Sequence, residues 1–194
     1  MNKQKVWFTS DTHFGSERTL ELSKRPFHSV KEMDESLIEN WNSKVSDDDI
    51  VFHLGDFGNY EVSKKLKGKI NLLYGNYERK DNLLDIEKCG RFSTIDTIES
   101  LLFTVNINDK GLPLDLILVH EPTNALDARN SLLPTDMILF GHIHGRQTFK
   151  KFPSKECFGM DVGVDAHHFY PISLDDVLFY KNACEFHYDE DVFI

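Results

Sequence analysis

The sequence contains few cysteines and no pattern that would pair them. Cys89, Cys157 and Cys184 form no C-x-x-C spacing, and an odd number of cysteines cannot pair completely within one chain. These features argue against a disulfide framework and against a zinc site built from cysteines. Reduced thiols are typical of cytoplasmic proteins, so we predict a cytoplasmic location.

Long hydrophobic runs are also absent. No stretch approaches the roughly 18 apolar residues that a membrane-spanning helix needs. The N-terminus leads into a short apolar segment that meets Asp11 at once, which is unlike a signal peptide. We therefore expect no membrane partner.

The 194 residues carry no Gly/Ser linker, repeat or low-complexity tract, and 40% of them are hydrophobic, which predicts one domain spanning residues 1–194.

An excess of basic residues is missing as well. The chain has 22 lysine and arginine residues against 32 aspartate and glutamate residues, giving a net charge of -10. A protein that binds a long polyanion by neutralising its backbone needs a basic face. The charge balance therefore does not indicate nucleic acid as a partner, and the acidic run 47–49 is most simply a solvated turn.

The apolar residues that are present predict an α/β fold. Ser29 and Glu32 form a capping-box pattern at the start of a helix. Apolar residues then follow at helical spacing: Val30, Met33, Leu37, Ile38, Trp41 and Val45. Short, nearly continuous apolar runs predict buried strands at 6–9, 50–54, 70–74, 101–107, 114–119, 137–140 and 174–180. Strands with helices between some of them indicate at least one mixed sheet.

Residues that bind metals follow five of these runs directly. In chain order they are Asp11 and His13, then Asp56, Asn76 and His120, and finally His142 and His144. Because sites in α/β sheets form where the carboxyl ends of strands meet, we expect these side chains to converge. Asn76 follows a glycine and has a second interpretation as a turn residue.

The residue types suit a pair of divalent cations. Imidazole and carboxylate ligands without thiolates favour Mn, Fe, Zn or Ni. Asp56 is the natural bridge, because one carboxylate offers an oxygen to each ion. Two ions about 3.5–4 Å apart can clamp a phosphate and hold a shared hydroxide, whose parent water then has a pKa near 7.

The motif order D-T-H, G-D, G-N-x-E, H and G-H-I-H resembles the calcineurin-like metallophosphoesterase superfamily. The motifs span residues 11–144, and segments 162–165 and 171–175 also look like small bacterial and phage members. The resemblance implies a single domain of this type, with a four-layer αββα sandwich of two mixed β-sheets flanked by helices. It also implies a metal-dependent phosphatase or phosphodiesterase that acts on a small phosphate ester, with two divalent metal ions of which Mn is favoured.

The resemblance further implies a division of the ligands. Asp11, His13 and His144 would hold the first ion together with Asp56. Asn76, His120 and His142 would hold the second, again with Asp56 as the bridge. His120 and His142 would also neutralise the charge that develops on the phosphoryl oxygens.

Tyr77 departs from the family pattern. The family reads G-N-H-D or G-N-H-E, where the histidine contacts the phosphate and protonates the leaving oxygen, but this chain reads Gly75-Asn76-Tyr77-Glu78. A phenol with a pKa near 10 can donate a hydrogen bond but is a poorer proton shuttle at neutral pH. Since general acid catalysis is typically worth about 10²–10⁴ in rate, we expect a weak enzyme or one tuned to acidic leaving groups. The alternative is a catalytically weak or inactive metal-binding scaffold that binds a partner or nucleotide.

Other polar residues near the motifs carry two interpretations. Arg79, Lys80 and Arg146 would either contact substrate phosphate or lie on the solvated surface. His53 precedes the second ligand motif within a strand and is interpreted as a core residue or one that orients a ligand. His167 and His168 are interpreted as an exposed turn, with a place at the rim of the site as the alternative.

Overall fold

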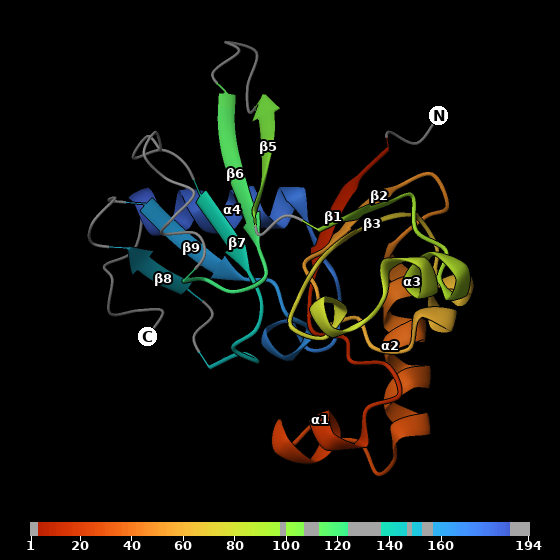
Figure 1. Ribbon diagram of the computed structural model, residues 1–194. Helices are drawn as coiled ribbons and strands as arrows, with labels where there is room; N and C mark the ends of the chain where they lie inside the picture. Colours follow the sequence, from red (N-terminus) through yellow and green to blue (C-terminus); the bar gives the residue numbers. More distant parts are fainter. Residues whose placement is uncertain are drawn as a thin grey trace.

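Two five-stranded mixed sheets face each other in the computed structural model (Figure 1). The structure describes residues 4–97, 100–106, 113–123, 137–146, 149–152 and 157–186. The expected α/β fold with two mixed sheets is confirmed.

The first sheet has the strand order β10-β1-β2-β3-β4. Strands β1 to β4 are parallel, and β10 pairs antiparallel with β1. The bounds are β1 Val6–Thr9, β2 Ile50–His53, β3 Lys69–Leu73, β4 Thr94–Asp96 and β10 Ile172–Ser173. Its connections contain helices α1 Glu17–Leu22, α2 Val30–Lys44 and α3 Leu83–Cys89, with 3-10 turns η1 Tyr60–Lys65 and η2 Glu78–Lys80. Three parallel strands of this sheet, β1, β2 and β3, therefore end on the same side of the molecule.

The second sheet has the order β5-β6-β7-β9-β8. Strands β6, β7 and β9 are parallel, while β5 and β8 pair antiparallel at the two edges. The bounds are β5 Ser100–Asn106, β6 Pro113–Val119, β7 Met137–Phe140, β8 Phe149–Phe152 and β9 Cys157–Asp161. The chain then passes through η4 Val164–Ala166 into β10 and the last helix, α4 Leu174–Phe186.

Side chains alternate between two apolar cores along the strands. On β1, Trp7 contributes to the core under α2 and α3, while Phe8 contributes to the core between the sheets. On β6, Leu116 and Leu118 share this second core, while Ile117 faces the opposite side of the second sheet. Both faces of the central strands are thus buried, which explains why their sequences are nearly continuously apolar.

Helix α2 begins at the predicted cap. The Ser29 hydroxyl accepts a hydrogen bond from the Glu32 N–H at 3.2 Å, and the Glu32 carboxylate accepts one from the His28 N–H at 2.7 Å. The cap thus satisfies backbone donors that the helix leaves free. Among the described residues, no helix has the length and apolarity that crossing a membrane requires.

Six of the seven predicted strands are present, apart from small shifts at their ends and residue 107, which lies outside the described residues. The seventh prediction, a strand at 174–180, is wrong because this segment forms the start of α4. The Asp176 N–H donates to the Ser173 hydroxyl at 3.1 Å, and the Ser173 N–H donates to the Asp176 carboxylate at 3.2 Å. This reciprocal cap starts a helix and overrides the apparent strand pattern.

Asp49 is also not the solvated turn residue that the acidic run suggested. It is only 5% exposed. Its carboxylate accepts hydrogen bonds from Lys5 N–H at 2.9 Å, Ser46 N–H at 2.9 Å and the Trp7 indole N–H at 3.0 Å. Asp49 therefore ties the turn before β2 to β1.

Candidate metal centre

The loops that follow β1, β2, β6, β7 and β9 are joined by backbone hydrogen bonds. The Asp11 N–H donates to Gly55 O at 3.0 Å, and the His13 N–H donates to Asp56 O at 3.0 Å. Gly141 N–H donates to His120 O at 3.0 Å, and an isolated parallel bridge joins Ser10 to Gly163. These contacts bring the ends of strands from both sheets to one place.

Glycines allow this close approach. A Cβ atom at Gly141 would overlap the side chains of Ser10 and Asp11, and one at Gly75 would overlap Asp56. The glycine that precedes a ligand in the G-N and G-H motifs is therefore required because neighbouring loops touch there.

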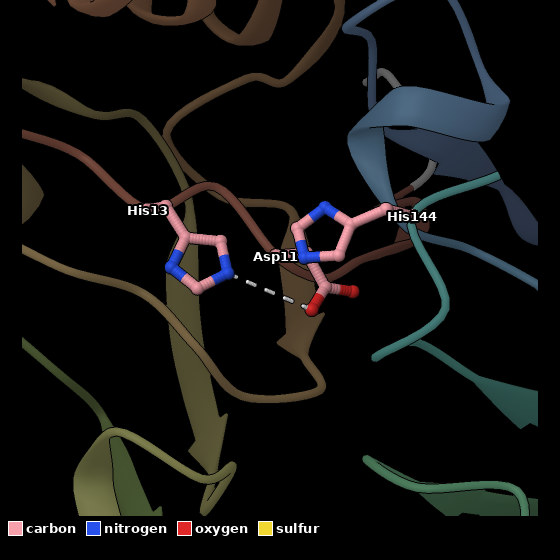
Figure 2. Close-up of side chains that lie close together, drawn as sticks. All are labelled: Asp11, His13 and His144. Carbon is pink, nitrogen blue, oxygen red and sulfur yellow. Dashed lines mark ion pairs between the residues drawn. The ribbon is translucent and has the colours of Figure 1, made fainter. Parts of the chain in front are cut away.

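Asp11, His13 and His144 form the first group of candidate ligands (Figure 2). One ligand atom from each lies within 4.8 Å of the others. The Nε2 atom of His13 is 4.0 Å from Oδ1 of Asp11, and the two imidazole rings stack with centroids 5.2 Å apart. Two neighbouring residues, Asp11 and His13, and the distant His144 thus present two imidazoles and a carboxylate to one point.

Asp11, Asp56 and His120 form a second group with the same spacing. Oδ2 of Asp56 lies 3.5 Å from Nε2 of His13 and 3.6 Å from Nε2 of His120. Asp56 therefore lies between a histidine of each group, which is the position that a bridging carboxylate would occupy. The carboxylate of Asp11 is shared by both groups as well.

Asn76 and His142 lie beside the second group. The Asn76 amide nitrogen is 3.1 Å from Nδ1 of His142, and the His142 ring meets the His120 ring edge to face at 5.2 Å. The structure thus gathers all seven predicted ligands, with five in the two close groups, His142 next to His120, and Asn76 next to His142.

Several atoms in the two groups are buried without a hydrogen-bond partner among the described residues. They are Oδ1 of Asp11, both ring nitrogens of His13 and Nε2 of His120. Buried polar atoms are ordinarily paired, so this concentration of unpaired donors and acceptors fits a site for cations. The donor set of imidazole and carboxylate also fits divalent first-row metals.

Burial shifts the pKa values of two of these groups in directions that matter for metal binding. It raises the pKa of Asp11 to about 6, with the neighbouring Asp56 adding to the effect and His144 opposing it. Burial lowers the pKa of His13 to about 2, helped by the charges of His144 and Arg25. The His13 imidazole is therefore neutral, which is the form that binds metals.

The backbone at these residues is strained. Five of the eight non-glycine residues with positive φ in the described part of the chain are predicted ligands: Asp11 at 57°, His13 at 48°, Asp56 at 57°, His142 at 72° and His144 at 51°. A left-handed conformation disfavours residues with a Cβ atom, and such strain gathers at functional sites. The loops are therefore held in the shape that directs these side chains inward.

Neighbouring groups fix the orientation of two histidines. Nδ1 of His120 lies 2.8 Å from Leu54 O, and Nδ1 of His144 lies 2.8 Å from Oδ2 of Asp165. Because both partners can only accept, each Nδ1 carries the proton. Nε2 of each ring is then the nitrogen that is left to face the cluster and bind a cation.

The sequence did not identify Arg25 and Asp165 as part of the site. The buried Arg25 guanidinium donates from Nε and Nη2 to the two carboxylate oxygens of Asp165, both at 2.8 Å. It also donates to the backbone carbonyls of Asp11 at 2.6 Å and Thr12 at 2.9 Å. Arg25 thus joins the first ligand loop to the group that orients His144. Segment 162–165 was noted only as a family resemblance, and Arg25 has no motif that would reveal it.

Glu78 was also missed as a structural element of the site. It is fully buried and accepts hydrogen bonds from Asp56 N–H at 2.8 Å, Phe57 N–H at 2.8 Å and Gly75 N–H at 2.9 Å. One carboxylate thus joins the loops after β2 and β3. In the sequence, Glu78 could have been recognised as the final residue of the G-N-x-E motif.

A cleft of about 530 Å³ opens over the ligands. Tyr77 lines it and meets the His13 ring edge to face at 4.8 Å, while its N–H donates to Oδ1 of Asp56 at 2.9 Å. Lys80 and Arg146 line the same cleft, joined by Arg18, which sequence reasoning did not consider.

His53, His167 and His168 are not among the residues that line this cleft. His53 is buried, with its Nε2 2.9 Å from the Thr12 hydroxyl, so it supports the first ligand loop as the orienting interpretation expected. His167 directs Nε2 to Asp161 O at 2.6 Å, and His168 lines a different hollow with Tyr170.

Comparisons with known proteins agree with this geometry. The family model of the calcineurin-like phosphoesterase superfamily domain matches residues 5–158 of this chain. An uncharacterized protein of Methanocaldococcus jannaschii is 26% identical over 184 residues, which cover 90% of each chain. The gene 66 protein of Mycobacterium phage L5 is 40% identical over 68 residues, which cover 35% of this chain and 30% of the phage protein.

A solved structure shares the fold. A protein of unknown function from Aquifex aeolicus superposes with a TM-score of 0.63 and 20% sequence identity, over 92% of this chain and 100% of that chain.

Proposed function

Because the chain belongs to the calcineurin-like phosphoesterase superfamily, we propose that it hydrolyses a small phosphomonoester or phosphodiester with the help of two divalent cations. The observation that carries the proposal is the pair of ligand groups that share Asp11, with Asp56 between His13 and His120 and with several buried atoms of the groups unpaired among the described residues. Mn²⁺ is the first ion to test, because carboxylate and imidazole ligands suit it.

We assign the ligands as two overlapping sets. Asp11, His13, His144 and Asp56 hold one cation, and Asn76, His120, His142 and Asp56 hold the other. The distances from Oδ2 of Asp56 to His13 and His120, 3.5 and 3.6 Å, support its role as the bridge. Bound divalent cations would supply Lewis acidity to the phosphoryl group and lower the pKa of water.

The protein's own groups bind and orient the substrate. His120 and His142, whose rings meet edge to face, would neutralise the charge that develops on the phosphoryl oxygens through the cation that they hold. Tyr77 lines the cleft beside His13 and donates a hydrogen bond from its hydroxyl to the leaving oxygen. Because a phenol is a weak proton donor at neutral pH, substrates with acidic leaving groups react best.

The test compares aryl phosphate monoesters and diesters with and without Mn²⁺, with the metal content measured on the same sample. Asp56→Asn should reduce the rate by at least about 10²-fold, since it removes the bridge. Asp85→Asn is the matched control, because Asp85 is exposed on α3 and lies outside the cleft. Full activity in Asp56→Asn, or no metal-dependent cleavage in the native protein, would overturn the proposal.

A second candidate function rests on Tyr77. If the site has lost catalysis and serves as a metal-binding scaffold for a partner or nucleotide, native activity is near zero and Tyr77→His raises it strongly. If Tyr77 takes part in the reaction, the same substitution lowers the rate on acidic leaving groups. The direction of change, measured with one aryl phosphate at saturating Mn²⁺, distinguishes the two functions.

A further inference from the structure

The cleft over the metal site has a charge opposite to that of the whole chain. Three cationic side chains line it, Arg18 from α1, Lys80 from η2 and Arg146 from the loop after β7, and we call these three residues the basic rim. The net charge of the chain is -10, yet among the described residues that line the cleft Asp56 is the only acidic one. A bridging Asp56 would be neutralised by the cations it binds. The basic rim is therefore a local reversal of charge at the entrance to the site.

The basic rim is available to a ligand. All three side chains are exposed, and within the described part of the chain none forms an ion pair with a carboxylate. Lys80 lies over the Tyr77 ring, with its Nζ 5.4 Å from the ring centroid, so the cation is held at the cleft wall. Cations concentrated in a cleft raise the local concentration of anions.

We propose that the substrate carries a second phosphate group, which binds the basic rim while the scissile phosphate lies at the metal ligands. This inference rests on the proposed function and adds the substrate class to it. The scissile phosphate alone would be satisfied by the two cations, so three further positive groups call for additional negative charge. Arg18 and Arg146 can each form paired hydrogen bonds to phosphate oxygens.

The cleft wall also favours a carbon skeleton between the two phosphates. Leu22 lines the cleft with 70% of its surface exposed, and Tyr77 is another of the lining residues. An exposed leucine beside a phenol ring offers apolar contact that an inorganic polyphosphate would not use. We therefore assign the site to a small bisphosphorylated organic molecule.

A long nucleic acid does not fit these observations. Nonspecific binding to a polyanion needs many cations along a track, and its affinity falls steeply with salt. The basic rim contains three cations, and the other described residues that line the cleft include no further lysine or arginine. Three cations match one additional phosphate group rather than a strand of nucleic acid.

The test uses two non-hydrolysable probes at a fixed free Mn²⁺ concentration, methylphosphonate and propane-1,3-bisphosphonate. Calorimetry gives the dissociation constant of each for the native protein and for Arg18→Gln/Lys80→Gln/Arg146→Gln. The native protein should bind the bisphosphonate about tenfold more tightly than methylphosphonate, since three exposed charge contacts add up to this order. The triple variant should lose this preference while its affinity for methylphosphonate changes less than about threefold.

The matched control is Lys31→Gln/Lys69→Gln/Lys88→Gln, which removes three exposed cations that do not line the cleft. It should keep the preference for the bisphosphonate. Equal affinity of the native protein for both probes would overturn the inference, as would a preference that survives in the rim variant. Cleavage of aryl phosphates is measured in parallel, so a failure of the inference leaves that activity intact, whereas absent cleavage counts against the proposed function itself.

Discussion

Oδ2 of Asp165 lies 2.8 Å from Nδ1 of His144, and the same carboxylate is held by two hydrogen bonds from the buried guanidinium of Arg25. Burial lowers the pKa of His144, but the hydrogen bond that its Nδ1–H donates to Asp165 and the charge of Asp11 outweigh burial and raise that pKa above its usual value. The carboxylate therefore orients the imidazole with Nε2 toward Asp11. Groups that orient a metal-binding histidine in this way commonly affect affinity by about 10–100-fold.

Asp165→Ala should weaken Mn²⁺ binding by about tenfold or more, because His144 loses the acceptor that fixes its ring. The dissociation constant measured by metal titration reports this directly, without relying on activity. Asp175→Ala is the control, since Asp175 is exposed at the start of α4. An unchanged dissociation constant in a folded Asp165→Ala protein would show that His144 is positioned by other contacts.

In the metal-free protein, the buried carboxylate of Asp11 should lower the stability of the fold. Its carboxylate is fully buried, one oxygen has no partner among the described residues, and burial raises its pKa to about 6. In excess chelator, Asp11→Asn should therefore increase the free energy of unfolding by about 1–3 kcal/mol. Mn²⁺ should stabilise the native protein strongly and this variant little, because ligand binding adds stability only to the folded state that binds it.

Thermal and urea unfolding with and without Mn²⁺ measure both effects. The two results have opposite signs, so a simple loss of folding cannot produce them. An Asp11→Asn protein that is less stable than the native protein without metal, or equally stabilised by Mn²⁺, would contradict the assignment.

Glu78 should matter for stability rather than for chemistry. Its carboxylate accepts three backbone hydrogen bonds that join the loops after β2 and β3. In either orientation, the amide of Glu78→Gln turns an NH₂ group toward at least one buried N–H. We expect a loss of about 2–4 kcal/mol in the free energy of unfolding, measured in urea. Glu87→Gln, exposed on α3, should stay within about 0.5 kcal/mol of the native protein, and the same small change in Glu78→Gln would refute the assigned role.

The sequence pointed to the candidate ligands because each follows an apolar run directly. A buried strand has an apolar sequence, and its end fixes where the next side chains lie in the fold. An apolar run therefore gives both the strand and the position of the residue after it, as at Asp11, Asp56 and His120. The two-sheet fold followed from the family resemblance. Strands β4 and β10 have too few residues to stand out, while β8 and β9 contain charged residues or glycine that interrupt the apolar pattern.

Contacts between distant segments were beyond the reach of pattern reasoning. Arg25 and Asp165 are 140 residues apart, and neither position has a local periodicity that would pair them. The strand predicted at 174–180 failed for a different reason, because the Ser173 and Asp176 cap was present in the sequence but outweighed by apolar composition. Where a capping pattern and an apolar run predict different elements, as at 173–180, the cap determines the secondary structure.

Asp49 gives the protein a stabilising contact that depends on pH and lies away from the metal ligands. Burial alone would raise the pKa of its carboxyl, but hydrogen bonds from Lys5, Ser46 and Trp7 outweigh burial and leave that pKa below its usual value. A carboxyl whose pKa is lower in the folded state stabilises the fold above its unfolded pKa of about 3.9, and the contribution disappears as the pH falls through the folded value.

Asp49→Asn should therefore reduce the free energy of unfolding by about 1–2 kcal/mol at neutral pH, because the charged acceptor of three donors is lost. The difference from the native protein should shrink as the pH is lowered below about 4, since both proteins then carry an uncharged group at this position. Urea unfolding of the metal-free proteins across this range measures it. The neighbouring Asp48→Asn, at an exposed position, serves as the control and should show no such dependence. A difference between native protein and Asp49→Asn that stays constant with pH would mean that shape, and not charge, sets the contribution of Asp49.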